Sequence, residues 1–448
     1  MQKARLDGLY LFLLGSLVLV LLGSVLSNGS AVAMVDFRVV YYPARCLIEH
    51  CDPYNESAVL KVAQAEGGTR PGDVTHANHF ARYLYLPTAF FLTVPFAMLP
   101  WGLAHVLWMG LIAGGLILGA FLMWDLGADS SPVICGALIG FFLANCELLI
   151  VLGNMAGIAI SLCIVAVWCF FRERFVVAGI FCLAISLAIK PHDSGLVWLY
   201  FLLAGGIFRR RALQTVLATA ALSLPGLVWT WIVSPHWMQE LHSNILAFAE
   251  RGGLTDPGNA SAGWHGLGMM INLQTVVSAF WNDPGIYNPV TYLICAPPIL
   301  IWVFVTLKTR PSNARAALAL ASIAPLSMLP FYHHQYDAKL LLLTVPACVL
   351  LWAERGMAGW LALLLNTTAF VLIGDISWLA ILGTINKLFP PGNGIGGQIL
   401  IDVQVFSAPL ILLIMGVFYL WVYASRSFAS DLPLKADSLH TPPHQATS

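Results

Sequence analysis

An acidic residue with basic neighbours stands directly after the first long apolar stretch of this 448-residue chain. Asp36 is followed by Arg38 and, further along the same segment, by Arg45. A carboxylate that emerges at a bilayer surface can take a proton from a hydroxyl, and arginines beside it can hold a phosphate. The spacing predicts a short amphipathic helix lying on the membrane. The alternative role for Asp36 is to cap this helix, which does not exclude catalysis.

Three further groups of polar residues stand at the ends of apolar runs. Arg82 precedes the apolar run 86–99, and we expect its side chain to lie at the depth of lipid phosphates. The alternative is that Arg82 is a snorkelling side chain in an interfacial aromatic belt. Lys190 ends another run, and we expect it to hold a phosphate; the alternative is a snorkelling side chain or one that pairs with Asp193. His333 and His334 lie in the segment that joins the apolar runs 316–331 and 340–352. We expect one of these two histidines to line the site, and the sequence does not decide which. Metal binding by this pair is not expected, because no third ligand cluster stands nearby.

The composition identifies the solvent that surrounds these residues. The chain is 59% hydrophobic and only 10% charged, with a mean hydropathy of +0.80, whereas soluble domains carry about 25% charged residues. No soluble core could bury this much apolar surface, so the apolar surface must face a lipid bilayer. Basic and acidic residues balance at 22 each, and we expect no nucleic-acid partner.

Thirteen apolar segments recur along the chain. They cover about 9–26, 86–99, 101–124, 133–152, 156–171, 175–189, 196–208, 212–233, 289–307, 316–331, 340–352, 357–376 and 403–423. Basic residues place both ends of the chain in the cytoplasm by the positive-inside rule. Thirteen crossings would put the ends on opposite sides, so one segment is expected not to cross. Segment 133–152, which contains Asn145 and Glu147, is our candidate.

The fold expected from these segments is an all-α polytopic membrane protein with about 12 transmembrane helices. A single domain spans 1–426, and a disordered cytoplasmic tail covers 427–448. Large outer loops at about 28–82 and 234–288 carry short amphipathic helices. Two of the nine cysteines, Cys46 and Cys51, fall in the first loop, where a disulfide and two unrelated thiols both fit.

A series of short motifs follows the same order as in a known family. They are Asp36-Phe37, Cys51-Asp52-Pro53-Tyr54, Tyr85-Leu86-Pro87, Gly153-Asn154, Lys190-Pro191 and His334-Gln335-Tyr336. This order resembles glycosyltransferase family 87, whose bacterial members are polyprenol-phosphate-mannose-dependent α-mannosyltransferases of the GT-C superfamily. The resemblance runs from about 36 to 351. Family members often carry Gly-Gln where this chain has Gly153-Asn154.

The resemblance implies a GT-C fold, Asp36 as the general base, and a late-loop histidine at His333 or His334. The residues themselves suggest Lys190, Arg82, Arg38 and Arg45 as contacts for the donor phosphate.

The expected reaction moves a sugar, mannose by the resemblance, from a polyprenyl-phosphate donor to a glycolipid or glycan hydroxyl. In-line attack inverts the anomeric centre, and basic side chains neutralise the leaving phosphate without a metal or cofactor. We expect the site to face the periplasm or outside from the inner (plasma) membrane. The alternatives are a transporter or flippase of lipid-linked sugars, and a ligase or polymerase of surface polysaccharide.

Overall fold

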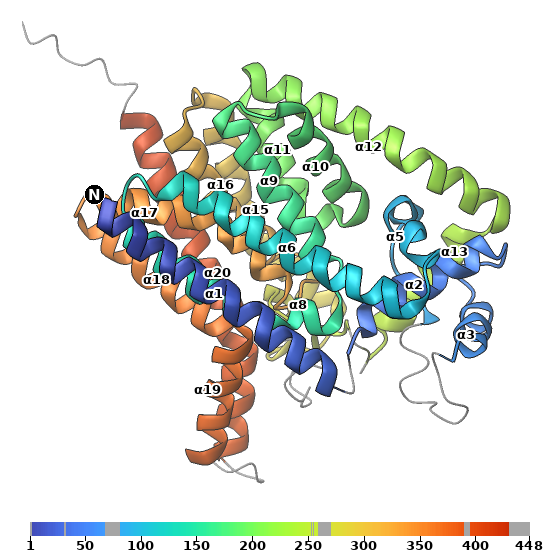
Figure 1. Cartoon of the computed structure of the whole chain (residues 1–448). Helices are drawn as coiled ribbons and strands as arrows, with labels where there is room; N and C mark the ends of the chain where they lie inside the picture. The colour runs from blue at the N-terminus through green and yellow to red at the C-terminus, as the bar shows by residue number, and fades with distance from the viewer. Residues whose placement is uncertain are drawn as a thin grey trace, which may run out of the picture.

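The computed structural model describes residues 2–30, 33–67, 81–251, 253, 255–258, 270–388 and 395–429. Within these ranges the chain is helical and has no strand; one isolated β-bridge joins Met270 to His334. Long helices pack side by side into one body, several short helices lie together at one end of it, and one further short helix projects from the body away from them (Figure 1). The prediction of an all-α protein is confirmed for the described part of the chain.

Two sets of helices divide the structure. The body consists of α1 (Gln2–Gly29), α6 (Trp101–Gly127), α7 (Pro132–Leu143), α8 (Glu147–Leu152), α9 (Ala156–Arg172), α10 (Val176–Ile189), α11 (Pro191–Ala204), α12 (Gly206–Val233), α15 (Pro284–Lys308), α16 (Asn313–Ser327), η3 (Asp337–Thr344), α17 (Val345–Ala353), α18 (Met357–Ile373) and α20 (Ile395–Ala429). The shorter elements are α2 (Val35–Ile48), α3 (Glu56–Ala65), η1 (Pro87–Ala89), α5 (Phe90–Ala97), α13 (Trp237–Ala249), α14 (Leu273–Ser278) and α19 (Asp375–Leu388). The two predicted loops therefore do carry short helices.

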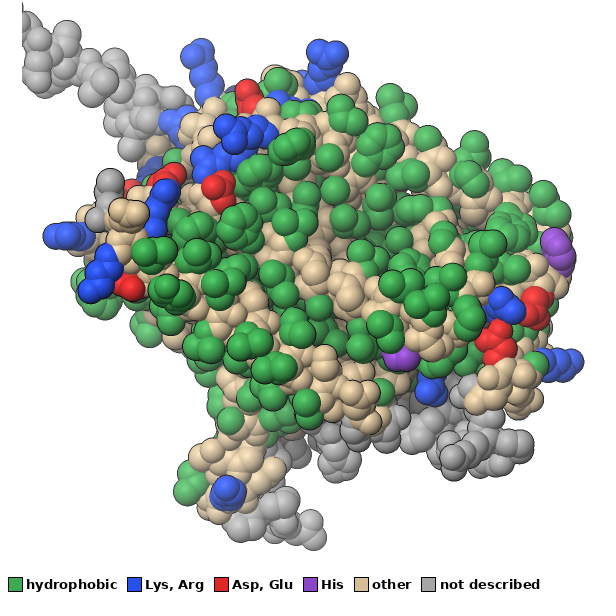
Figure 2. Space-filling view, in the orientation of Figure 1, with side chains coloured by type: hydrophobic (Ala, Val, Ile, Leu, Met, Phe, Trp, Pro, Cys, Tyr) green, Lys and Arg blue, Asp and Glu red, His purple; other side chains and the backbone are tan. Residues whose placement is uncertain are grey.

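The surface of the body is apolar. Figure 2 shows hydrophobic side chains over the middle of the visible face, with charged side chains gathered toward its two ends. Six helices of the described part are long and apolar enough to cross a membrane. A seventh crossing is obtained if α18 and α19, which meet at a 75° bend, count as one broken span. These helices are consistent with a multi-pass membrane protein.

Small residues bring α1 and α7 into backbone contact. Gly136 and Gly140 are four residues apart, so they lie on one face of α7. A Cβ atom on Gly136 would collide with the carbonyl oxygen of Gly8, and one on Gly15 would collide with that of Gly140. Without a hydrophobic driving force in lipid, close packing of this kind is a main source of helix association.

Replacing Gly140 by leucine should therefore separate α1 from α7. The new side chain meets the backbone of Leu11, which cannot move aside as a flexible side chain would, and overpacking typically costs about 1–3 kcal/mol. We expect a lower melting temperature of the detergent-solubilised protein. Gly110→Leu on α6 is the matched control, since nothing lies within 4 Å of a Cβ at that position. Equal melting temperatures for the two variants would contradict this packing.

The contacts of α1 also show that segment 133–152 traverses the body. Gly8 meets Pro132 near the start of this segment, and Gly23 meets Ile150 near its end. The segment therefore runs alongside α1 in the same direction, interrupted only between α7 and α8. It also meets the criteria for a membrane span by length and composition. The prediction that it is the segment that does not cross is wrong.

Segment 86–99 has the shape expected of the segment that does not cross. At its start, the Thr88 hydroxyl donates to the carbonyl of Ala188 near the end of α10. At its end, the Tyr41 hydroxyl of α2 donates to Leu99 O over 2.8 Å. Both ends thus lie at the same end of the body, near α2. The segment consists of η1, which begins at Pro87, and the eight-residue α5, which contains Pro95 and is too short for a straight span.

A buried ion pair satisfies the backbone at two helix breaks. The Lys339 ammonium donates to Asn145 O at 2.7 Å, in the break between α7 and α8, and to Asp375 Oδ1 at 2.8 Å, at the start of α19. Asp375 Oδ2 in turn accepts the N–H of Leu148 at 2.7 Å. Non-helical backbone at membrane depth needs such partners inside the protein. The pair also fixes the start of η3, which follows the segment containing His333 and His334.

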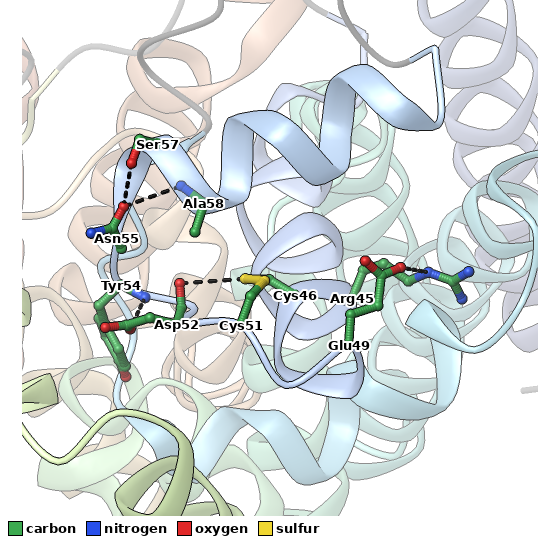
Figure 3. The surroundings of a disulfide bond; sticks show 9 residues. All are labelled: Arg45, Cys46, Glu49, Cys51, Asp52, Tyr54, Asn55, Ser57 and Ala58. Atoms are coloured by element: carbon green, nitrogen blue, oxygen red, sulfur yellow. Dashed lines mark hydrogen bonds and ion pairs between the residues drawn. A yellow bond between two sulfur atoms is a disulfide. The ribbon is translucent and has the colours of Figure 1, made fainter.

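The first loop is fastened by a disulfide between Cys46 and Cys51 (Figure 3). Of the two interpretations of these cysteines, the structure contains the bonded pair. Beyond it, Asn55 Oδ1 accepts the N–H of Ala58 at 3.1 Å and begins α3. The first three residues of the predicted disordered tail, 427–429, are helical and belong to α20, which ends at Ala429; the rest of that prediction lies outside the described residues.

Candidate active site

Asp36 lies in the first turn of α2 but does not cap it. The N-cap is Met34, whose backbone is left-handed with φ 57°, and no side chain caps this end. The Asp36 carboxylate accepts a hydrogen bond from Asn154 Nδ2 instead, at 2.7 Å. The capping interpretation of Asp36 is therefore not what the structure contains.

A glycine lets the Asn154 side chain reach α2. Gly153 has φ +67°, and a Cβ on it would lie 2.7 Å from Met34 Sδ and 2.8 Å from Phe37 Cβ. Both the positive φ and the close approach favour glycine at this position. The motif Gly153-Asn154 thus joins the end of α8 to the start of α2 and orients the carboxylate of Asp36.

The environment of Asp36 makes it a weaker acid than usual. Burial raises the pKa of this carboxyl to about 6. The Asn154 hydrogen bond and the positive charge of Lys190 act in the opposite direction, and the negative charge of Asp337 raises the pKa further. A base with a pKa near the working pH is suited to accepting a proton from a hydroxyl.

If Asp36 must be ionised to act, kcat/KM should rise as the pH increases through about 6 and level off above it. Asn154→Ala removes a hydrogen bond that favours the charged form of Asp36. The rising limb of the pH profile should therefore move to higher pH by roughly one unit. Asn313→Ala is the control, because Asn313 bonds Phe171 O near the other end of the body. A pH profile of Asn154→Ala identical to that of the wild type would show that Asp36 does not govern the limb.

Lys190 is buried at the junction of α10 and α11, where Pro191 prevents one helix from continuing into the next. Its ammonium forms an ion pair with Asp337 and lies 3.4 Å from Asp193 Oδ2. It also lies 5.1 Å from the centre of the Tyr336 ring. The pairing with Asp193 that the sequence offered as the alternative role is present, and Asp337 is a second partner that sequence analysis did not identify.

The two adjacent histidines point in different directions. His333 is fully buried, and its Nε2 lies 3.7 Å from Asp193 Oδ1. The backbone N–H of His334 donates to Asp337 Oδ2 at 2.9 Å, and its ring packs between Tyr332 and Tyr336. His333 is therefore the histidine that contacts the charged cluster.

Two further metal-ligand residues do stand beside His333, contrary to the expectation from the sequence. The ligand atoms of His192, Asp193 and His333 all lie within 4.8 Å of one another. His192 and Asp193 follow Lys190 directly in the chain but lie far from His333 in sequence. The fold alone brings the three together, by packing α11 against the segment that precedes η3.

Three tyrosines complete the surroundings of Asp36. The side chains of Tyr85, Tyr332 and Tyr336 are close enough to feel its charge. They and Asp36 are only half-buried, so this part of the cluster has an accessible side. Sequence analysis did not assign these tyrosines a role, although all three stand in segments that it singled out. Aromatic rings and phenol hydroxyls of this kind can contact a sugar.

The arginines expected at the site have other partners. Arg82 pairs with Glu56 of α3 at 2.8 Å. Arg45 pairs with Glu66 at 2.9 Å and with Glu49 at 3.2 Å (Figure 3 shows the latter). Arg38 lies over the ring of Trp101 at 5.5 Å. Because it is two residues from Asp36, it leaves α2 about 200° away around the helix. The structure thus brings together Asp36, Lys190 and His333, and places the arginines among groups outside this cluster.

The fold and the cluster define a multi-pass membrane protein with a polar site at one end of its helices. The family model described as glycosyltransferase family 87 matches residues 83–330, which is more than half of the chain. The chain belongs to this family and is by class a membrane glycosyltransferase. No curated protein and no solved structure matches it. The matched region holds Tyr85, Asn154 and Lys190, whereas Asp36 and His333 stand outside it.

Proposed function

We propose that the protein transfers a sugar, mannose in the first instance, from a polyprenyl-phosphate donor to a hydroxyl of a glycolipid or glycan. One observation carries this proposal. The half-buried carboxylate of Asp36 and the buried ammonium of Lys190 share one cluster at the end of an apolar helical body. A lipid-linked sugar has its anomeric carbon and its phosphate at this depth of a bilayer.

In the proposed reaction, the acceptor hydroxyl oxygen attacks the anomeric carbon from the side opposite the phosphate. The new glycosidic bond forms as the bond between the anomeric carbon and the phosphate oxygen breaks. The hydroxyl proton passes to Asp36, and the polyprenyl phosphate leaves with an additional negative charge. The Lys190 ammonium stabilises that charge, and His333 belongs to the same cluster as Lys190. A β-linked donor gives an α-glycoside.

The proposed topology is a single GT-C domain over residues 1–426 with twelve crossings. They are α1, α6, α7 with α8, α9, α10, α11, α12, α15, α16, η3 with α17, α18 and α20. Two ion pairs, Arg5 with Asp129 and Arg172 with Asp125, support the orientation. They lie at the end of α6 remote from α2, so the positive-inside rule puts that end in the cytoplasm. The site then faces the outside of the inner (plasma) membrane.

The proposal is tested with purified protein in nanodiscs and a panel of glycolipid acceptors. Radiolabelled polyprenyl-phosphate-mannose should label an acceptor, and the label should be released by an α-mannosidase. GDP-mannose is the matched donor without a lipid and should give no product. Product from GDP-mannose alone would refute the proposal. Movement of the lipid-linked sugar across vesicles without a covalent product would favour a flippase, and a requirement for a lipid-linked oligosaccharide would favour a ligase or polymerase.

A further inference from the structure

His192, Asp193 and His333 have the spacing of metal ligands. Asp193 Oδ1 lies 3.5 Å from His192 Nε2 and 3.7 Å from His333 Nε2. Ligand atoms held about 2.1 Å from a tetrahedral zinc ion lie about 3.4 Å from one another. Small movements of these side chains would therefore bring all three into coordination. Two imidazoles and one carboxylate form a donor set that suits a divalent transition metal.

The hydrogen bonds around His333 leave the required lone pair free. Its Nδ1 lies 3.2 Å from Phe331 O. A carbonyl only accepts, so Nδ1 carries the proton and the lone pair of the neutral ring is on Nε2. Within the described residues, neither that nitrogen nor either carboxylate oxygen of Asp193 forms a hydrogen bond, although both residues are at least 97% buried and the Lys190 ammonium lies 3.4 Å from Asp193 Oδ2. Two electron-rich groups that face each other in this way repel unless a proton or a metal cation lies between them.

The charges of the cluster also call for a second cation. Lys190 lies within ion-pair distance of both Asp193 and Asp337, and Asp36 is close enough to feel its charge. One ammonium thus serves three carboxylates. The phosphate of the proposed donor would bring a further negative charge to this place. An additional positive charge beside Lys190 would allow the phosphate to bind.

We propose that His192, Asp193 and His333 bind a divalent transition-metal ion, for which Zn²⁺ fits the ligand set best. Three protein ligands leave a coordination position open, and a phosphate held by Lys190, which lies 3.4 Å from Asp193 Oδ2, would be close enough to occupy it. This role of the ion rests on the proposed function, and it replaces the expectation of a metal-free reaction. The His192 side chain is 41% exposed and offers the ion a path of entry.

Metal binding is tested without any sugar donor. Untagged full-length protein in detergent is stripped with a chelator, dialysed against Zn²⁺, and analysed for metal content by mass spectrometry. We expect about one ion per chain in the wild type. Asp193→Asn and His192→Gln should each weaken binding by at least about 10-fold. His242→Gln, an exposed histidine of α13, is the control and should bind as the wild type does.

Several outcomes would overturn the proposal. Stripped wild-type protein that takes up no Zn²⁺ would show that a proton, and no metal, separates His333 from Asp193. Full binding by His192→Gln, whose exposed side chain is not needed for packing, would also contradict it. Asp36→Asn should bind Zn²⁺ normally while transferring no sugar. If the wild type transfers sugar but binds no ion, the proposed metal site is wrong and the proposed function stands. If the wild type binds the ion but uses no lipid-linked donor, the proposed function is wrong and the metal site stands.

Discussion

Asp36→Asn should reduce sugar transfer by about 10³-fold or more while leaving the protein folded. General-base catalysis contributes about 10²–10⁴-fold, and an amide cannot accept the proton of the acceptor hydroxyl. The change keeps the shape of the side chain, and its remaining carbonyl oxygen can still accept the hydrogen bond from Asn154. The measurement is the initial rate with polyprenyl-phosphate-mannose, together with the melting temperature in detergent.

A second carboxylate on the same loop serves as the control for that experiment. Asp52 Oδ1 accepts the backbone N–H of Tyr54 at 3.0 Å, which an asparagine also allows. Asp52→Asn should therefore keep both its activity and its melting temperature. If Asp36→Asn retained more than about one tenth of the wild-type rate, Asp36 could not be the general base, and its position beside Lys190 would need another explanation.

Lys190→Met should have the largest effect on stability. The Lys190 side chain is 6% exposed, and its partners Asp193 and Asp337 are exposed by 1% and 2%. Removing one partner of a buried ion pair leaves an uncompensated charge and typically costs about 3–5 kcal/mol. We expect a clear fall in melting temperature and the loss of sugar transfer. Lys308→Met, at the exposed end of α15, should change neither.

A double variant separates the two effects of Lys190. Asp337→Asn removes one of the negative charges that Lys190→Met leaves without a partner. The double variant should therefore regain part of the lost stability but no activity, since no ammonium remains to neutralise the leaving phosphate. Recovery of sugar transfer together with stability would mean that Lys190 has a purely structural role.

The broad features of this protein follow directly from its sequence. High hydropathy and few charges require helices in lipid, and the polar residues that interrupt apolar runs mark where a site can form. Asp36, Lys190 and the undecided pair His333 and His334 are marked in this way, because each stands at the end of an apolar run or in a segment joining two runs. Their convergence depends on the tertiary arrangement of α2, the junction of α10 and α11, and the segment before η3, which no local pattern encodes.

The incorrect or undecided predictions share one physical cause. Segments 86–99 and 133–152 are both apolar and both interrupted, so hydropathy does not show which one crosses. Backbone contacts between glycines of α1 and α7 decide the question. The partners of Arg82 and Arg45, Glu56 and Glu66, are more than 20 residues away in the chain. Adjacent histidines are equivalent in sequence, and tertiary contacts such as the hydrogen bond from His334 N to Asp337 and the one from Ile271 N to His333 O set which ring faces Asp193.

The most direct test of the catalytic assignment is a cryo-electron-microscopy structure with an unreactive polyprenyl phosphonate analogue of the donor. The account predicts the phosphonate within hydrogen-bond distance of Lys190, with the anomeric carbon on the accessible side of Asp36 between Tyr85, Tyr332 and Tyr336. A phosphonate bound instead at Arg82 or Arg45, with Asp36 remote from the sugar, would contradict it.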